Sequence, residues 1–446
     1  MAVRKSSIFY GILLFALVLR VASEPTASIS FFVLATASLF GRKEAIQTLA
    51  LCWLFTMLSP GIAPPASLGA LGRYAIIFAA AASVFLRYQP SKCKSDQNRA
   101  VLYTVALGAF LIVHSLLFSV IPDVSILKAI SWTVVVVTLF VAWAGLSAAQ
   151  SEQLINQLFS ALTLIMLASL PLVVLPLGYL RNGSGLQGIL NHPQAFGPTM
   201  SLLAVWLVLG MLISNRPPWK IILLSGVCLA LLLMSEARTA GLAMLGGIIA
   251  SLIVTSTLSR APIIKLFPGF RSSRVGLVVF FTVLLVTVFA TKLIEALSTF
   301  LLKRGNFTSI IEAYDGARGR LINNMFYNIE QDPFTGIGFG IASDPMKMLV
   351  IRDPIFNLPI GASIEKGVLP IAVIEEVGVF GFLMFLFWGV SILQGALKKG
   401  GVAVGILASV LLLNFGESTF FSVGGMGMLT LVIFGWVATG HRERKI

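Results

Sequence analysis

The stretch from residue 126 to residue 146 reads ILKAISWTVVVVTLFVAWAGL, and Lys128 is the only charged residue in it. An apolar block of about 20 residues can cross a bilayer as a helix, because a helix satisfies its own backbone hydrogen bonds. Similar blocks occur along the chain, which is 57% hydrophobic and 11% charged, with a mean hydropathy of +0.94. This composition predicts an all-α polytopic membrane protein rather than two or three soluble domains.

Fourteen apolar blocks are candidate transmembrane helices, and because several are short we expect 12 to 14 spans. They lie near residues 7–22, 26–40, 45–59, 73–88, 100–121, 126–146, 154–177, 197–214, 220–235, 240–258, 276–297, 368–392, 402–416 and 424–440. The chain therefore divides into spans 1–11 (1–297), a large loop (298–367), and the last spans with a tail (368–446). The first block imitates a secretory signal, but Arg20 inside its end favours a retained first helix.

The distribution of charge predicts the orientation of the chain. If both termini are cytoplasmic and every block crosses the membrane, the inner segments carry 19 of the 32 basic residues and four of the 18 acidic residues. The inner side is then strongly positive and the outer side nearly neutral, as the positive-inside rule requires. The net charge of +14 therefore indicates topology and attraction to anionic membrane lipids, and not a nucleic-acid partner. We expect a multi-pass protein of a bacterial inner membrane.

The loop 298–367 is predicted to lie on the outer, periplasmic side, and it has the densest polar content of the chain. Residues 317–331 within it predict an amphipathic helix that ends at Asp332-Pro333. The apolar stripe of this helix has four-residue spacing and consists of Leu321, Met325 and Ile329. Such a helix could lie on the bilayer surface and present Arg318 and Arg320, either to a ligand or to lipid headgroups.

Three alternating glycines follow this helix, in the sequence PFTGIGFG at 333–340. The spacing does not match GxGxxG or a P-loop, and no strand–turn–helix unit surrounds it. We therefore expect a tight turn that brings its backbone close to another element.

Two short stretches near the outer ends of spans also carry polar residues. The bend SEARTA at 235–240 contains Glu236 and Arg238. An arginine near membrane depth is costly unless it is paired or used, so Arg238 is a candidate ligand-binding residue, with a structural ion pair as the alternative. The stretch NHPQAFG at 191–197 contains His192, the only histidine expected on the outer side. A lone histidine cannot hold a metal, so His192 is either a hydrogen-bonded structural residue or a binding residue.

Acidic residues gather after the large loop. Glu365 and Lys366 end the loop, Glu375 and Glu376 lie within the next apolar block, and Glu417 lies at the outer end of the span after it. Two adjacent carboxylates inside a span imply either a water-filled cavity or cationic partners. With the arginines, they suggest an anionic ligand that is handled in an outer cavity.

Four stretches occur in a specific order: NHPQAFG (191–197), SEARTA (235–240), RLINNMFYNIEQDPFTGIGFG (320–340) and EKGVLPIAVIEEVGVFG (365–381). In this order, around one large outer loop, they resemble the O-antigen ligase/polymerase superfamily, whose members transfer or polymerise lipid-linked polysaccharide at the outer face of the bacterial inner membrane. The resemblance covers about 190–385. It implies a multi-spanning C-type glycosyltransferase whose donor is a glycan on undecaprenyl pyrophosphate, and whose acceptor is a lipid-linked or core glycan. No metal, nucleotide sugar or other cofactor is implied.

Arg238 and Arg320 match arginines of that superfamily. We hypothesise that they clamp the pyrophosphate, because guanidinium groups bind phosphate oxygens bidentately and stay protonated. Glu365 is the candidate general base for the attacking sugar hydroxyl. Further candidate substrate-binding residues are Arg318, Arg304, His192, Lys366 and Glu236.

One departure from the family pattern bears on the reaction. The ligases typically place a His-Asn pair before the GxxG that closes the last motif, and here the positions before Gly378–Gly381 hold Gly367 and Val368. This favours a polymerase of O-antigen or exopolysaccharide repeat units over a ligase that transfers to lipid A-core. The rival from another class is a membrane transporter of an anionic solute. Transporters usually contain internal repeats, and the sequence shows none.

Overall fold

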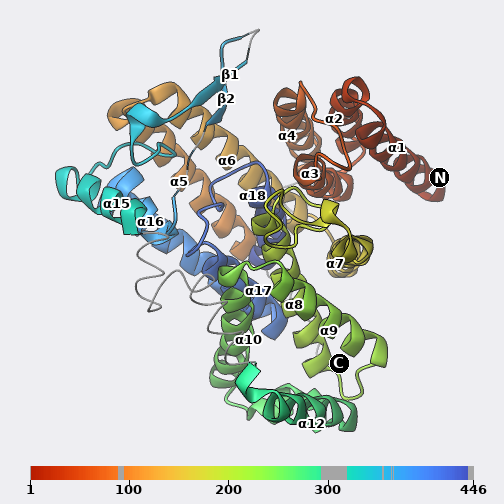
Figure 1. The fold of residues 1–446 in the computed structure, drawn as a ribbon. Coiled ribbons are helices and arrows are strands. Elements are labelled where there is room, and N and C mark those ends of the chain that lie inside the picture. Colours follow the sequence, from red (N-terminus) through yellow and green to blue (C-terminus); the bar gives the residue numbers. More distant parts are fainter. Residues whose placement is uncertain are drawn as a thin grey trace.

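The computed structural model describes residues 2–88, 95–292, 319–353, 356–362, 364 and 366–439, without the side chains of residues 2–6, 95–98 and 320. The described chain is predominantly helical (Figure 1). Its helices are α1 (Ala2–Ala22), α2 (Glu24–Ser38), α3 (Arg42–Met57), α4 (Gly69–Phe85), α5 (Ser95–Phe118), α6 (Pro122–Ala144), α7 (Ala148–Ser169), α8 (Pro193–Ile213), α9 (Trp219–Met234), α10 (Arg238–Ser259), α11 (Ile263–Leu266), α12 (Ser273–Val288), α15 (Arg320–Gln331), α16 (Leu369–Lys399), α17 (Gly401–Leu413) and α18 (Met426–Ala438).

Each of the fourteen predicted blocks contains a helix at its expected place. Among the described residues, six helices are long and apolar enough to cross a membrane: α5, α6, α7 with the 3-10 turn after it, α8, α10 and α16. Six shorter helices are also apolar, namely α1, α4, α9, α12, α17 and α18. The remaining two predicted spans form α2 and α3, whose 15 and 16 residues are fewer than a perpendicular span usually needs. These findings support an all-α polytopic membrane protein.

The segments that connect the helices lie at two opposite ends of the bundle, and hydrogen bonds between distant segments show which connections share an end. At one end, Ser59 N donates to Ile189 O (2.9 Å), and Val120 N donates to Ile337 O (3.1 Å). We call this end the loop end; it comprises residues 58–68, 119–121, 170–192, 235–237, 332–353, 356–362, 364, 366–368 and 414–425. At the opposite end, Ser251 Oγ donates to Gly401 O (2.7 Å). That end comprises residues 39–41, 86–88, 145–147, 214–218, 260–272 and 400.

Two strands, β1 (Val350–Arg352) and β2 (Pro359–Ala362), pair antiparallel at the loop end and project beside α5 and α6 (Figure 1). Arg352 Nη2 lies 2.6 Å from Asp123 Oδ2 at the start of α6. Arg73 Nη2, from the first turn of α4, donates to Ile360 O at 3.1 Å. These contacts fasten the strands to the bundle.

The core lies where α5, α6, α16 and α18 meet, and three buried tryptophans fill it. Each indole N–H has a partner: Trp132 bonds Phe420 O (3.3 Å), Trp143 bonds Val432 O (3.0 Å) and Trp388 bonds Thr104 Oγ1 (2.8 Å). These buried N–H groups are therefore satisfied within the protein.

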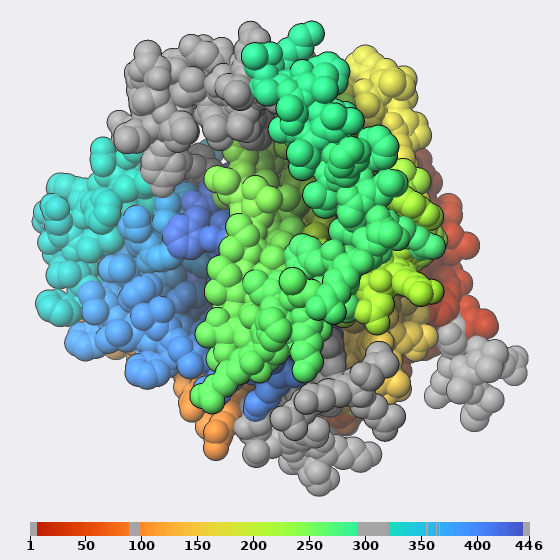
Figure 2. All heavy atoms as spheres, turned by 90° about the horizontal axis from the view of Figure 1, so that it is seen from below, coloured from red at the N-terminus to blue at the C-terminus, as the bar shows by residue number. Residues whose placement is uncertain are grey.

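Small residues set the packing of α10 against α17. Gly247 lies directly against Ser409 and the carbonyl oxygen of Gly405, where a Cβ would collide. Ser409 Oγ donates to Ala243 O at 3.0 Å. Small residues permit this close approach of backbones, which is a common packing mode in membranes. Seen from below, the cyan segment that contains α15 and the red N-terminal segment lie at opposite sides of the molecule, with green segments of the chain between them (Figure 2).

The predicted amphipathic helix is present as α15, which ends at Gln331 as expected. Residues 317 and 318 of the predicted helix lie outside the described residues. Within the stripe, Met325 is fully buried and Leu321 and Ile329 are half-buried, and the helix packs on α16. The apolar stripe therefore faces the protein, while Phe326 and Tyr327 are exposed on the other side.

Candidate functional site

The stretches NHPQAFG and SEARTA lie side by side at the loop end. Gly197 of the first faces the side chains of Ala237 and Ser235, and a Cβ at Gly197 would collide with the Ala237 methyl group. Glu236 takes a positive φ of 55° at the bend, and Ser235 is buried with its hydroxyl donating to Leu232 O (2.6 Å). The two stretches are separated in sequence by α8 and α9, so the packing of these helices brings them together.

His192 is exposed and is the N-cap residue of α8. Its Nδ1 accepts a hydrogen bond from Gln194 N at 3.1 Å, which satisfies one of the donors that a helix start leaves open. The expectation that it is the only histidine on this side is wrong. His114 lies in the last turns of α5, and its Nε2 bonds the carbonyl oxygen of Thr335 in the glycine turn. Nothing local marks His114, because it lies inside an apolar block.

Arg238 is the first residue of α10 and is half-buried. Its neighbour Thr239 packs against Gly416, where a Cβ would collide with the threonine side chain. Two residues further on, Ser418 N donates to Lys366 O at 3.0 Å. The segment 414–425 therefore connects the SEARTA bend with the end of the large loop.

The glycine turn 333–340 packs directly on α16, as predicted from its three glycines. Gly336, Gly338 and Gly340 all have positive φ values (66°, 114° and 72°). A Cβ at Gly336 would collide with the backbone at Glu375 and Glu376, so only glycine fits there.

This turn meets α16 where the helix is broken. Gly378 has a φ of 67° and a ψ of −177°, which is non-helical. The turn supplies the missing partners: Ile337 N donates to Glu375 O (2.9 Å), and Gly338 N to Glu376 O (2.9 Å). In return, Val379 N donates to Pro333 O at 3.0 Å. The turn thus supplies hydrogen bonds to the backbone at the break, as an interrupted helix inside a membrane span requires.

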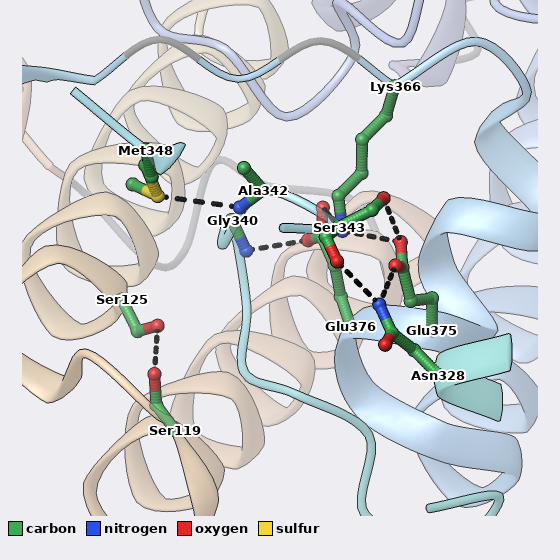
Figure 3. A network of polar contacts seen from close by, with 10 residues as sticks. All are labelled: Ser119, Ser125, Asn328, Gly340, Ala342, Ser343, Met348, Lys366, Glu375 and Glu376. Carbon is green, nitrogen blue, oxygen red and sulfur yellow. Dashed lines mark hydrogen bonds and ion pairs between the residues drawn. The ribbon is translucent and has the colours of Figure 1, made fainter. Parts of the chain in front are cut away.

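Two buried carboxylates stand just before the break, and one lysine pairs with both. Lys366 Nζ lies 2.8 Å from Glu375 Oε2 and 3.2 Å from Glu376 Oε1 (Figure 3). The three side chains are 1%, 0% and 6% exposed, respectively. The angles at Lys366 Nζ do not fit a hydrogen bond in either contact, so both contacts are ion pairs. Of the two possibilities that the sequence left open, a cavity or a cationic partner, the structure shows the cationic partner.

Neutral donors complete the network. Asn328 Nδ2 of α15 donates to Glu375 Oε1 (2.7 Å), and Ser343 Oγ donates to Glu375 Oε2 (3.1 Å) (Figure 3). Gly340 N donates to Glu376 Oε2 at 2.6 Å. Lys128 of α6 packs beside Gly340 and lies 5.3 Å from the ring centre of Phe339. We call Lys366, Glu375, Glu376, Asn328, Ser343 and Gly340 the loop-end network.

The loop-end network is closed in this structure. The cavity beside Glu376 has a volume of about 10 Å³, roughly the minimum that one water needs. Lys366 and the two carboxylates therefore hold the loop and α16 together rather than face an open site. Among the described residues, no group of three or more histidine, cysteine or acidic side chains could hold a metal ion.

Several candidate residues lie outside what the structure describes. Glu365, Arg318 and Arg304 are outside the described residues, and Arg320 is placed as the first residue of α15 without its side chain. Glu236 is described and is exposed at the bend next to Arg238.

Asn414 is a buried residue of the loop end that sequence reasoning missed. Its Oδ1 accepts from Thr419 N (3.0 Å) and Phe420 N (2.9 Å), and its carbonyl oxygen accepts from Leu369 N (2.9 Å). It thereby joins α16, α17 and the segment after α17. An asparagine near the end of the apolar block 402–416, just before Gly416, is the signal that could have identified it as a helix-end residue.

Comparison with known proteins adds no relative: no protein family matches the chain, and no curated protein is significantly similar to it.

Proposed function

We propose that the protein is a polysaccharide polymerase that transfers a lipid-linked glycan from undecaprenyl pyrophosphate to an acceptor sugar hydroxyl at the outer face of a bacterial inner membrane. The observation that supports this most is convergence. The stretches 191–197, 235–240, 332–340 and 366–381 come from distant parts of the chain, yet they lie at one end of the bundle and contact one another through residues 414–425. Residues that bind one substrate must meet in this way.

The electrostatics of the loop end suit an anionic leaving group. Because Lys366 pairs with both Glu375 and Glu376, it offsets one of their two negative charges and weakens their repulsion of a pyrophosphate. Arg238 begins α10, whose N-terminus carries a partial positive charge. Guanidinium groups there would stabilise the charge that develops on the pyrophosphate as the glycosidic bond breaks.

The proposed reaction is one displacement. The oxygen of the acceptor hydroxyl forms a bond to the anomeric carbon of the donor sugar, and the bond from that carbon to the pyrophosphate oxygen breaks. The pyrophosphate leaves with the bonding electron pair, and Arg238 and Arg320 hold it. Glu365 accepts the hydroxyl proton. No redox partner is needed.

The network changes the role we propose for Lys366. A lysine that is buried and pairs with two carboxylates is a positioning residue rather than a ligand for substrate. It directly follows Glu365 in the sequence, and its carbonyl oxygen is also fixed by Ser418 N. Lys366 would thus help to hold the end of the loop against α16.

Two other functions remain candidates. A ligase that transfers to lipid A-core would use the same donor and clamp. A transporter of an anionic solute is favoured by one observation, the break in α16 at Gly378 beside buried acids, because transporters bind solutes at interrupted helices. The two enzyme readings and the transporter differ in what happens to the donor.

The deciding experiment is reconstitution in proteoliposomes with a polyprenyl-pyrophosphate oligosaccharide. A ladder of products would support the polymerase, and a single transfer to lipid A-core would instead identify a ligase. Unchanged donor together with uptake of an anionic solute would identify a transporter and refute glycosyl transfer.

Arg238→Lys tests the clamp. Lysine keeps the charge but lacks the bidentate fork, so we expect turnover to fall by about 10²–10³. The matched control is Arg274→Lys, since Arg274 is also half-buried but lies at the opposite end, bonded to Pro217 O at 3.0 Å. Turnover within about twofold of wild type in Arg238→Lys would refute its role.

A further inference from the structure

A cavity of about 410 Å³ lies far from the loop-end network, between α1, α3 and α7. This volume is in the range of small-molecule sites. The cavity exists because α1 and α7 do not pack together along their length; Gln157 Nε2 of α7 bridges them with a hydrogen bond to Tyr10 OH at 3.4 Å. Trp143 of α6 and Val432 of α18 also line the cavity.

The wall of the cavity is apolar except at one end. Leu54, Leu162 and other aliphatic side chains form most of the lining. Three polar side chains form a hydrogen-bonded row: Gln47 Nε2 donates to Gln157 Oε1 (3.1 Å), and Gln157 donates to Tyr10. Gln47 lies in the second turn of α3, so the row is toward the opposite end of the bundle.

The cavity opens toward the apolar surface of the bundle. Leu14 of α1 and Leu164 of α7 are 64% and 66% exposed; α7 is long enough to cross a membrane, and α1 is one of the shorter apolar helices. In a bilayer these side chains contact lipid, so the cavity is open to hydrocarbon rather than to water. Its occupant must therefore be apolar over most of its length.

The dimensions favour a chain. The lining runs from Ile46 to Leu54 on α3, and from Leu154 to Ile165 on α7. At 1.5 Å per residue these runs are about 12 and 16 Å long, parallel to the helix axes. At the inner end of the groove, Trp53 is 2% exposed, and its indole N–H has no hydrogen-bond partner among the described residues.

A cation lies beyond the cavity lining, at the start of α3. Lys43 lies one turn before Gln47 and therefore on the same face of α3. A lysine at the membrane surface attracts phosphate. The order of these features along α3 therefore matches the order of the parts of a phospholipid. The cation corresponds to the phosphate, the row of polar side chains to the ester region, and the apolar groove to the acyl chain.

We propose that this groove holds one acyl chain of an anionic phospholipid from the leaflet at the opposite end of the bundle. The phosphate lies at Lys43, the ester region lies at the Gln47–Gln157–Tyr10 row, and the chain extends toward Trp53. A polyprenyl tail that enters from the loop end would place its first carbons at Trp53 and Ile165. The cation at that end, Arg20, is buried and already donates to Phe55 O (2.9 Å) and Pro64 O (2.6 Å), so it is engaged by carbonyl oxygens rather than open to a phosphate. The site is independent of the glycosyl transfer proposed above.

The test is native mass spectrometry of the full chain, purified in mild detergent and mixed with phosphatidylglycerol. We expect one phosphatidylglycerol to stay bound. Ala161→Trp, which fills the groove, should abolish retention. Leu164→Trp, on the lipid-facing surface of the same helix, is the control and should retain the lipid. Equal retention by both variants would overturn the proposal, as would displacement of phosphatidylglycerol by an equimolar polyprenyl phosphate.

A second variant does not depend on repacking the groove. Lys43→Gln should reduce the preference for phosphatidylglycerol over phosphatidylethanolamine about fivefold, the effect of roughly 1 kcal/mol for one basic residue at the membrane surface. An unchanged preference would show that no phosphate lies at Lys43 and would overturn the proposal even if Ala161→Trp failed to fold.

Discussion

Replacement of Lys366 by methionine tests the loop-end network most directly. Methionine keeps an unbranched side chain, one atom shorter than that of lysine, and removes the charge, so Glu375 and Glu376 would remain buried beside each other without their shared cation. Glu375 would keep the hydrogen bonds from Asn328 and Ser343, and Glu376 would keep the one from Gly340 N. Removal of one partner from a buried ion pair costs about 3–5 kcal/mol. We expect Lys366→Met to lose about that much free energy of unfolding.

The assay is equilibrium unfolding in mixed micelles of mild detergent and SDS, followed by tryptophan fluorescence. The surface pair Lys347–Asp344 provides the control. Its charged atoms are closer, at 2.6 Å, but the lysine is 85% exposed. The hydrogen bond from Lys347 lowers the pKa of Asp344, so this contact is present at neutral pH and is lost as the pH falls through that lowered pKa. Even so, Lys347→Met should leave stability unchanged at pH 7, because water screens the pair.

The double variant Lys366→Met/Glu375→Gln completes the argument. Glutamine removes one of the two uncompensated charges, so we expect it to recover part of the stability that Lys366→Met loses. If Lys366→Met were as stable as Lys347→Met, or if the second substitution destabilised the protein further, the burial of the pair would not control stability and the reasoning would be refuted.

Two further predictions concern the backbone of the same region. Gly378→Ala should destabilise the protein by more than the roughly 1–2 kcal/mol that a left-handed residue costs, because the new Cβ also collides with a carbonyl of the glycine turn. The control is Gly389→Ala in the same helix, where the new Cβ meets nothing within 4 Å, so this variant should be neutral or slightly stabilising. Equal unfolding midpoints of the two variants would contradict this prediction. Asn414→Ala leaves two backbone N–H groups without their acceptor, so we expect the free energy of unfolding in the same SDS titration to fall by about 2–4 kcal/mol. A fall of less than about 0.5 kcal/mol would mean that water replaces the amide and would contradict this prediction.

The predictions that the structure confirms rest on local physics. An apolar block must become a helix in a bilayer, so all fourteen blocks contain one. The spacing of Leu321, Met325 and Ile329 determines one face of a helix without knowledge of the partner, and the helix ends before Asp332-Pro333 as a proline requires. Three alternating glycines indicate a close backbone approach, and this too is a local property.

The identity of the partners was not available from such patterns. The sequence indicates that Glu375 and Glu376 need a cavity or a cation. Only the tertiary structure identifies Lys366 as that cation, because it shows how the end of the large loop folds back onto α16. His114 looked like a residue of an apolar span, and it reaches the glycine turn only because α5 and α16 pack together. Ion pairs and hydrogen bonds between distant segments depend on distances that periodicity does not contain.

The sequence by itself determined the membrane class, the helices, the large loop with its amphipathic helix, and the residues that contain the polar chemistry. Only the tertiary structure decided that α16 breaks at Gly378, where sequence analysis predicted one continuous span over 368–392. A glycine in a helix costs little by itself, so it does not predict a break. The break becomes stable because Pro333, Ile337 and Gly338 supply the hydrogen bonds that the helix lacks there, and a backbone group at membrane depth must find such a partner.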